Sequence, residues 1–407
     1  MKEVYIAMKQ SRAQTVYKKS NCLYYFIPFA VLSFYFTLHT ILFGAHEASG
    51  YYLIHYLYTY RHGFIPRGLV GEILSLFFEK INDNITRSVI LLFSCMLIAG
   101  ASLCIGKALS KSKSHPESFK IIAIIICILC VVPNSFRTYF DDMKLDKALW
   151  ALSLLAVFLL DTKVGVYFVP IICVAATLIN PVFLFCSMLL VSIAMLYCCV
   201  DTWSKKWIFL CAISYLAMIV IGLYGAVREK SLGFENEMDM LKYYFSRYDG
   251  SISESTLDFM ARECMIDYFL PSKEFIAAAY QFYCVEWKNG LSTLFNVVFV
   301  SLPAYFGLTV FWIKAIKAET VKSKKLVFFL CMISPLVQIA PILMSWEGSK
   351  YFGNNILVQL CLIVFFIVQK NEASISAAAG IVQWAKKNPL ISTAILLYAG
   401  MFVFAPT

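Results

Sequence analysis

The segment Tyr60–Glu72 carries the residue types that bind phosphate groups. It holds Arg61, His62 and Arg67 among three glycines and one proline. Guanidinium groups bind phosphate oxygens in bidentate fashion, and clustered glycine and proline indicate tight turns and close backbone approach. The apolar stretch Leu69–Phe78 that follows can form a surface helix, with backbone N–H groups at its start facing an anion. We predict that Arg61, His62 and Arg67 bind a phosphate or pyrophosphate; the alternative is a surface loop whose arginines reach lipid headgroups.

Two further short segments hold charged residues next to apolar runs. The segment 137–147 opens with Arg137 and carries three carboxylates, of which Asp141 is a candidate general base. Such a cluster can serve acid–base chemistry or bind a divalent cation, and the alternative is a solvated turn whose charges pair locally. Glu347 and Lys350 lie in a charged turn after a proline-broken run. We predict Arg137 and Lys350 as substrate-binding residues and Glu72, Asp141 and Glu347 as catalytic candidates.

The region 227–290 is a long polar stretch with 11 acidic and 7 basic residues and many aromatic rings. Aromatic rings beside carboxylates are typical of a carbohydrate-binding surface. Amphipathic helices resting on a bilayer have the same composition, so that alternative stays open.

The composition requires a membrane environment for the elements that carry these segments. Hydrophobic residues make up 60% of the 407 residues, charged residues only 15%, and the mean hydropathy is +0.72. Apolar runs recur at close to the roughly 20 residues that span about 30 Å of hydrocarbon. We predict an all-α polytopic integral membrane protein, 1–407 forming a single membrane domain, with about eleven transmembrane helices and ten or twelve as alternatives. The predicted spans are 23–44, 89–108, 121–136, 147–160, 164–180, 182–200, 207–226, 291–313, 326–345, 355–369 and 389–405.

The distribution of Lys and Arg predicts the orientation. With the N-terminus in the cytoplasm, the short inner segments carry 20 basic residues against 8 outside, once the long loop is set aside. Residues 45–88 are then the first outer loop and 227–290 the large outer loop. The shorter segments around 137–147 and Lys350 also lie outside, as does the C-terminus. No basic stripe interleaved with aromatics is present, so nucleic acid is not a predicted partner. Walker A and HExxH motifs are absent from the sequence, and we predict neither cofactor nor metal.

This pattern resembles the O-antigen polymerase (Wzy) class, within the GT-C-like membrane glycosyltransferases that use polyprenyl-linked sugars. The resemblance rests on ten to fourteen spans, a large outer loop in the second half, and the segment RHGFIPRGLVGE. It implies polymerisation of undecaprenyl-pyrophosphate-linked oligosaccharide repeats on the periplasmic face of a bacterial inner membrane, with helices in the periplasmic loops. Arg61, His62 and Arg67 would hold the pyrophosphate, and Glu72, Asp141 or Glu347 would activate the acceptor hydroxyl. The implied partners are the lipid-linked oligosaccharide, the lipid bilayer and a chain-length regulator protein.

Two other functions stay open. One is a GT-C transferase that adds a single sugar from a polyprenyl-monophosphate donor, with acidic residues in its first outer loop. The other is a non-enzymatic flippase for lipid-linked oligosaccharides, although flippases usually have short loops on both sides.

Overall fold

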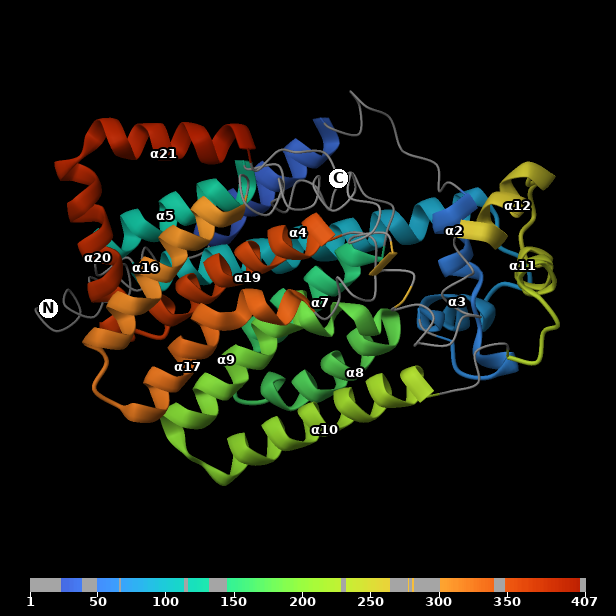
Figure 1. Cartoon of the computed structure of the whole chain (residues 1–407), viewed down its shortest axis with the longest axis horizontal. Coiled ribbons are helices and arrows are strands. Elements are labelled where there is room, and N and C mark those ends of the chain that lie inside the picture. Colours follow the sequence, from blue (N-terminus) through green and yellow to red (C-terminus); the bar gives the residue numbers. More distant parts are fainter. Residues whose placement is uncertain are drawn as a thin grey trace, which may run out of the picture.

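The computed structural model is a bundle of helices that run side by side (Figure 1). It describes residues 23–38, 50–65, 67–112, 116–131, 145–227, 232–263, 277, 280–281, 301–339 and 348–402. The bundle contains the helix Leu23–Leu38, α4 (Asp83–Ser112), α5 (Pro116–Val131), α7 (Asp146–Leu160), α8 (Val169–Ile179), α9 (Ser187–Thr202), α10 (Lys205–Val227), α16 (Leu302–Ala318), α17 (Lys322–Ile333) and α19 (Gly348–Val368). No strand occurs in the described ranges.

Three helices are long and apolar enough to cross a membrane, namely α4, α10 and α19. The helices Leu23–Leu38 and α9, and the stretch Gly165–Ile179, are apolar but shorter. The all-helical architecture predicted from the composition is therefore confirmed for the described residues, and three of the helices have the length and composition of membrane spans. The count of eleven spans stays a prediction.

Helix breaks occur where the sequence predicted them. The predicted span 164–180 is a 3-10 turn, η2 (Gly165–Phe168), followed by α8, which ends at Ile179. Asn180 is extended, and η3 (Pro181–Phe185) separates it from α9. Proline cannot donate a backbone hydrogen bond and disfavours a helical conformation at the residue before it, so the helix ends there.

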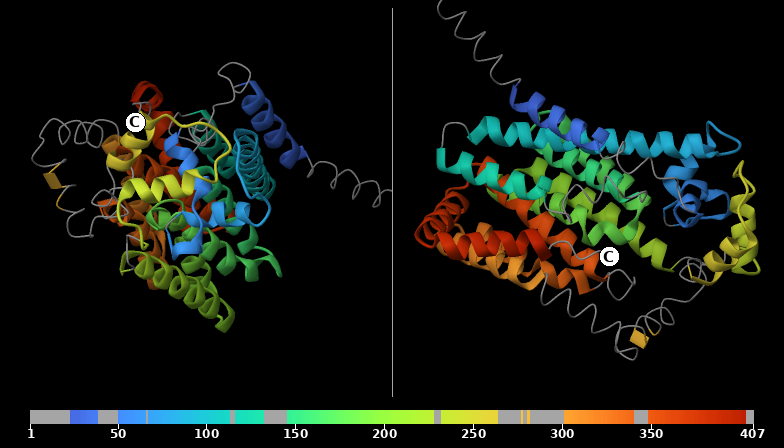
Figure 2. Two further views of the ribbon diagram at one scale, coloured as in Figure 1. Left: turned by 90° about the vertical axis from the view of Figure 1, so that its right-hand side faces the viewer. Right: turned by 90° about the horizontal axis from the view of Figure 1, so that it is seen from above.

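Successive helices alternate in direction, so their connections gather at two ends of the bundle (Figures 1 and 2). We call the end that carries residues 50–83 and 232–263 the loop end. We call the opposite end, where α4, α7, α9, α16 and α19 finish, the lysine end. There Asp161 accepts hydrogen bonds from Lys111 (2.8 Å) and Gln369 (2.6 Å) and pairs with Lys107 (2.9 Å), which ties α4, α7 and α19 together. The distribution of Lys and Arg predicted which connecting segments are cytoplasmic. The described parts of these segments all lie at the lysine end.

A helix that the sequence did not predict covers the lysine end. Residues 370–387 were expected as a connection, but α20 (Glu372–Lys387) forms there and packs against α16 and α5. Asn371 caps it by accepting from the Ser374 backbone N–H at 2.8 Å. Its buried face consists of small residues, including Ala373, Ala377 and Ala378, which give little hydropathy signal. The next helix, α21 (Pro389–Phe402), turns to run along the bundle (Figure 1).

The two-sided arrangement makes a prediction about topology. Single cysteines at Lys322, the first residue of α17, and at Ser251, between the helices of the loop end, replace exposed residues at opposite ends of the bundle. In a background without native cysteines, we expect an impermeant maleimide added to intact cells to label Ser251→Cys and to spare Lys322→Cys until the membrane is opened. Labelling of both variants from outside would refute the orientation.

Candidate functional site

The loop end is built from two segments that lie far apart in the sequence. The first forms α2 (Gly50–Leu57), η1 (Tyr60–His62) and α3 (Gly68–Ser75); the second forms α11 (Glu237–Phe245) and α12 (Glu254–Glu263). The Ile81 backbone N–H donates to the Arg247 carbonyl at 2.7 Å, and the Asp249 N–H donates to the Ile81 carbonyl at 2.9 Å. The Tyr248 hydroxyl donates to Asp83 at 2.6 Å. The described parts of the two predicted outer loops therefore form one folded unit.

Aromatic rings fill the interface between these segments. Tyr244 is fully buried and meets Tyr58 edge-on, with 5.0 Å between ring centroids. The His62 ring lies 4.5 Å from Tyr243 and 4.8 Å from Phe234. Several aromatics of the long loop are thus packed against the first loop and are not displayed as a sugar-stacking surface. The contacts of the His62 ring are with these aromatic side chains, and its phosphate-binding role stays a prediction.

Two glycines of the segment Tyr60–Glu72 are required by the backbone, as the sequence predicted. Gly63 has φ of +118°, and α3 crosses the end of α2 so closely that a β-carbon on Gly71 would lie 2.2 Å from the Tyr58 carbonyl oxygen. That oxygen belongs to the backbone, so a side chain here forces α3 away from α2. Position 71 therefore fixes the distance between α3 and the segment that carries Arg61.

We expect Gly71→Ala to disrupt the loop end. Overpacking at a tight contact costs about 1–3 kcal/mol and more where the neighbour is rigid backbone. The variant should show a lower melting temperature and faster proteolysis within residues 50–83. Gly307→Ala in α16 is the matched control, because a β-carbon there meets no atom within 4 Å. Equal stability of the two variants would contradict the close packing of α3.

Arg67 occupies a strained position at the start of α3. It is the N-cap residue, with φ of 68° and ψ of 9°, a left-handed conformation that costs a non-glycine residue about 1–2 kcal/mol. Its Nη1 lies 2.9 Å from Nε2 of the buried His55. As the N-cap residue, Arg67 directly precedes the first helical residue of α3. Strained backbone of this kind is typical of binding sites.

Glu72 joins the same site from the second turn of α3. Its Oε2 accepts the Tyr60 backbone N–H at 2.8 Å, which fixes the carboxylate beside η1. Burial and the Glu72 carboxylate raise the pKa of the Tyr60 hydroxyl. The Tyr60 hydroxyl and the Thr59 hydroxyl are both buried without a hydrogen-bond partner. Two polar groups next to Glu72 are therefore ready to bind an added ligand.

Arg247, in the long loop, is a site residue that the sequence reading missed. It is 92% buried, and its Nη1 donates to the Leu57 carbonyl oxygen, while its Nη2 is buried without a partner. Burial lowers the pKa of Arg247, and the nearby charge of Arg61 lowers it further, whereas Glu72 raises it. An anion bound here would offset the repulsion between the two positive charges. No local motif could have identified Arg247, because it lies 190 residues from Leu57 in the sequence.

The other predicted site residues cannot be joined to this cluster. Arg137, Asp141 and Glu347 lie outside the described residues, and Lys350 lies in the first turn of α19 with its side chain outside the description. Within the described ranges, no three His, Cys, Asp or Glu residues come together as metal ligands.

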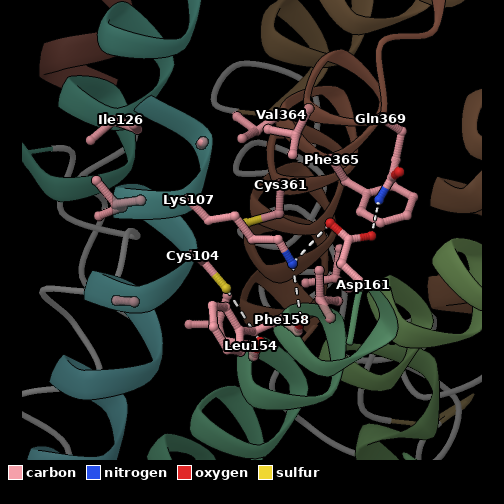
Figure 3. Close-up of a pocket in the computed structure, with 16 residues that line it drawn as sticks. Cys104, Lys107, Ile126, Leu154, Phe158, Asp161, Cys361, Val364, Phe365 and Gln369 are labelled. Atoms are coloured by element: carbon pink, nitrogen blue, oxygen red, sulfur yellow. Dashed lines mark hydrogen bonds and ion pairs between the residues drawn. The ribbon is translucent and has the colours of Figure 1, made fainter. Parts of the chain in front are cut away.

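A cavity of about 70 Å³ lies at the lysine end, away from this cluster (Figure 3). Its lining is mostly apolar, and Lys107 and Asp161 pair with each other at its rim. Lys107 also donates to the Phe158 carbonyl oxygen at 2.9 Å, and Gln369 donates to Asp161. Burial opposes ionisation of Asp161, but the hydrogen bonds from Lys111 and Lys107 hold its pKa below the usual range. With its charges already paired, this cavity offers less chemistry than the loop end.

Comparisons with protein-family models, with curated proteins and with solved structures find no match to this chain. The site itself therefore carries the functional argument.

Proposed function

We propose that this protein is a membrane glycosyltransferase that polymerises undecaprenyl-pyrophosphate-linked oligosaccharide repeats on the periplasmic face of a bacterial inner membrane. The observation that carries the proposal is the buried Nη2 of Arg247, without a partner and close to Arg61, at the loop end of a membrane-type helical bundle. A pyrophosphate at a membrane surface supplies the negative charge and the acceptor oxygens that such a pair of guanidinium groups binds.

Each site residue has a role in the proposed reaction. Arg61, Arg67 and Arg247 bind the pyrophosphate of the donor, and the start of α3 adds backbone N–H groups. The acceptor hydroxyl oxygen forms a bond to the anomeric carbon of the donor sugar, and the bond from that carbon to the pyrophosphate oxygen breaks. The hydroxyl proton passes to a carboxylate, for which Glu72 is the candidate within the described residues. Undecaprenyl pyrophosphate leaves, and its charge is stabilised by the arginines.

Deletion of the gene in the native bacterium tests the proposal. We expect the surface polysaccharide to change from a ladder of lengths to a single repeat unit, and plasmid-borne wild-type protein to restore the ladder. Unchanged polysaccharide length would refute the proposal. Loss of one sugar within each repeat would indicate a single-sugar transferase, and accumulation of complete lipid-linked repeats on the cytoplasmic side would indicate a flippase.

A further inference from the structure

A second group of polar residues lies inside the bundle, apart from the loop-end arginines. The helices α4, α7 and α19 all run from the loop end to the lysine end (Figure 1). Between α4 and α7 the register is regular: Cys104 donates to the Leu154 carbonyl oxygen at 3.2 Å, and the Lys147 ammonium donates to the Ser94 hydroxyl at 3.3 Å. Lys147 is therefore placed by α4 inside the protein and does not face lipid.

The third helix brings Asn354 to the same level. Cys361 on α19 lines the lysine-end cavity together with Ala101 on α4 and Leu154 on α7. Seven residues are close to two helical turns, so a residue seven positions earlier lies on the same face, about 10 Å nearer the loop end. Those positions are occupied by Ser94, Lys147 and Asn354. The helical repeat therefore places Ser94, Lys147 and Asn354 at one level of the three parallel helices.

This layer is deeply buried, and the Asn354 side chain in it has no hydrogen bond. Asn354 is 2% exposed, and neither its Nδ2 nor its Oδ1 has a hydrogen-bond partner. Lys147 is 2% exposed and its neighbour Asp146 is 3% exposed. Buried amides are nearly always hydrogen-bonded, and ionisable groups inside a membrane bundle mark binding sites more often than packing. The next residue shows the contrast, since Asn355 accepts from Gln359 at 3.0 Å and bonds Ser334.

The chemistry of the layer favours an uncharged ligand. Lys147 and Asp146 contribute opposite charges, so the layer has no net attraction for an anion such as pyrophosphate. Asn354 offers one donor group and one acceptor. The Ser94 hydroxyl donates to the Ile90 carbonyl oxygen at 3.0 Å and accepts from Lys147, which leaves it one acceptor position. Paired donors and acceptors of this kind match the hydroxyl groups of a sugar. The charge balance thus differs from that of the arginine site at the loop end.

We propose that the layer of Ser94, Lys147 and Asn354, with Asp146 beside it, binds uncharged sugar hydroxyls of a lipid-linked substrate. This inference rests on the proposed function for the source of the sugar, because the arginine site holds the pyrophosphate and a second site must orient a sugar. Asn354 is the residue whose two polar atoms the ligand satisfies.

Ligand-induced stabilisation of the purified, full-length protein in nanodiscs tests the inference. The probes are 50 mM methyl glycosides of glucose, galactose, mannose, rhamnose and N-acetylglucosamine, with sodium pyrophosphate as the anionic comparison. We expect at least one glycoside to raise the melting temperature of the wild type. We expect Asn354→Leu to abolish that rise without lowering the melting temperature of the free protein, because no hydrogen bond of Asn354 is lost. Ser94→Ala, a smaller change in the same layer, should weaken the rise.

Asn355→Leu is the matched control: it should lower the melting temperature of the free protein, because it breaks bonds to Ser334 and Gln359, and keep the glycoside effect. No stabilisation of the wild type by any glycoside, or an undiminished effect in Asn354→Leu, would overturn the inference. A lower melting temperature of free Asn354→Leu would also overturn it, by assigning Asn354 a structural role. Glycoside binding through Asn354 in a protein that forms no polymer would keep this site and refute the polymerase assignment.

Discussion

The variant Arg67→Lys is expected to form polymer about 10- to 100-fold more slowly than the wild type, with an unchanged amount of protein in the membrane. Lysine keeps the charge but cannot reproduce the planar bidentate contact of a guanidinium with phosphate oxygens. A charge-assisted hydrogen bond contributes about 1.5–3 kcal/mol, and each 1.4 kcal/mol is about tenfold in rate. The measurement is the length distribution of surface polysaccharide in cells whose protein level is determined by immunoblot.

Arg67→Gly separates binding from backbone strain. Glycine adopts the left-handed conformation of position 67 without cost. We expect this variant to be about as stable as the wild type, because relief of the backbone strain offsets the lost contact with His55. We expect it to be inactive, because it lacks the guanidinium group. An arginine that only reaches lipid headgroups can be replaced by lysine without loss of activity. A wild-type polysaccharide ladder from Arg67→Lys would therefore refute phosphate binding by Arg67 and favour the alternative, a membrane-surface turn. Arg61→Lys is expected to reduce polymer in the same direction and less severely, since Arg61 is exposed.

The second large effect is expected for Glu72→Gln. The amide oxygen of glutamine can still accept the Tyr60 backbone N–H, so the fold around η1 is preserved. The variant loses the ability to take a proton, and general-base catalysis contributes about 10²- to 10⁴-fold. We therefore expect at least a hundredfold loss of polymer formation, measured in membranes at equal protein amounts.

Glu79→Gln is the control for Glu72→Gln. Glu79 lies in the same loop and is exposed, and we expect it to tolerate the change. Activity in Glu72→Gln equal to that of Glu79→Gln would exclude Glu72 as the base. Asp141 and Glu347 would then be the carboxylates to test.

Local signals in the sequence predicted a large part of the candidate site. The apolar stretch Leu69–Phe78 predicted a surface helix, and α3 forms at Gly68–Ser75. Arg67 lies beside the start of that helix, as expected. These features follow from residues close together in the chain, for which turn chemistry and helical periodicity are informative.

Contacts between distant segments could not be read in the same way. Arg247 reaches the site only because the backbone of residues 247–249 pairs with Ile81, and neither segment has a pattern that specifies this pairing. The helix α20 was missed because alanines and serines on its buried face give little hydropathy contrast. The hydrogen bond between Lys147 and Ser94 depends in the same way on the packing of α7 against α4.

The central claim is that this protein transfers sugar from a polyprenyl-pyrophosphate donor. Purified protein in liposomes, supplied with the undecaprenyl-pyrophosphate-linked repeat of its native bacterium, tests it most directly when the lipid product is identified by mass. We predict release of one undecaprenyl pyrophosphate for each new linkage, together with a lipid carrying two repeats. Release of undecaprenyl monophosphate from a monophosphate-linked sugar, or movement of the lipid across the bilayer without a new linkage, would contradict the claim.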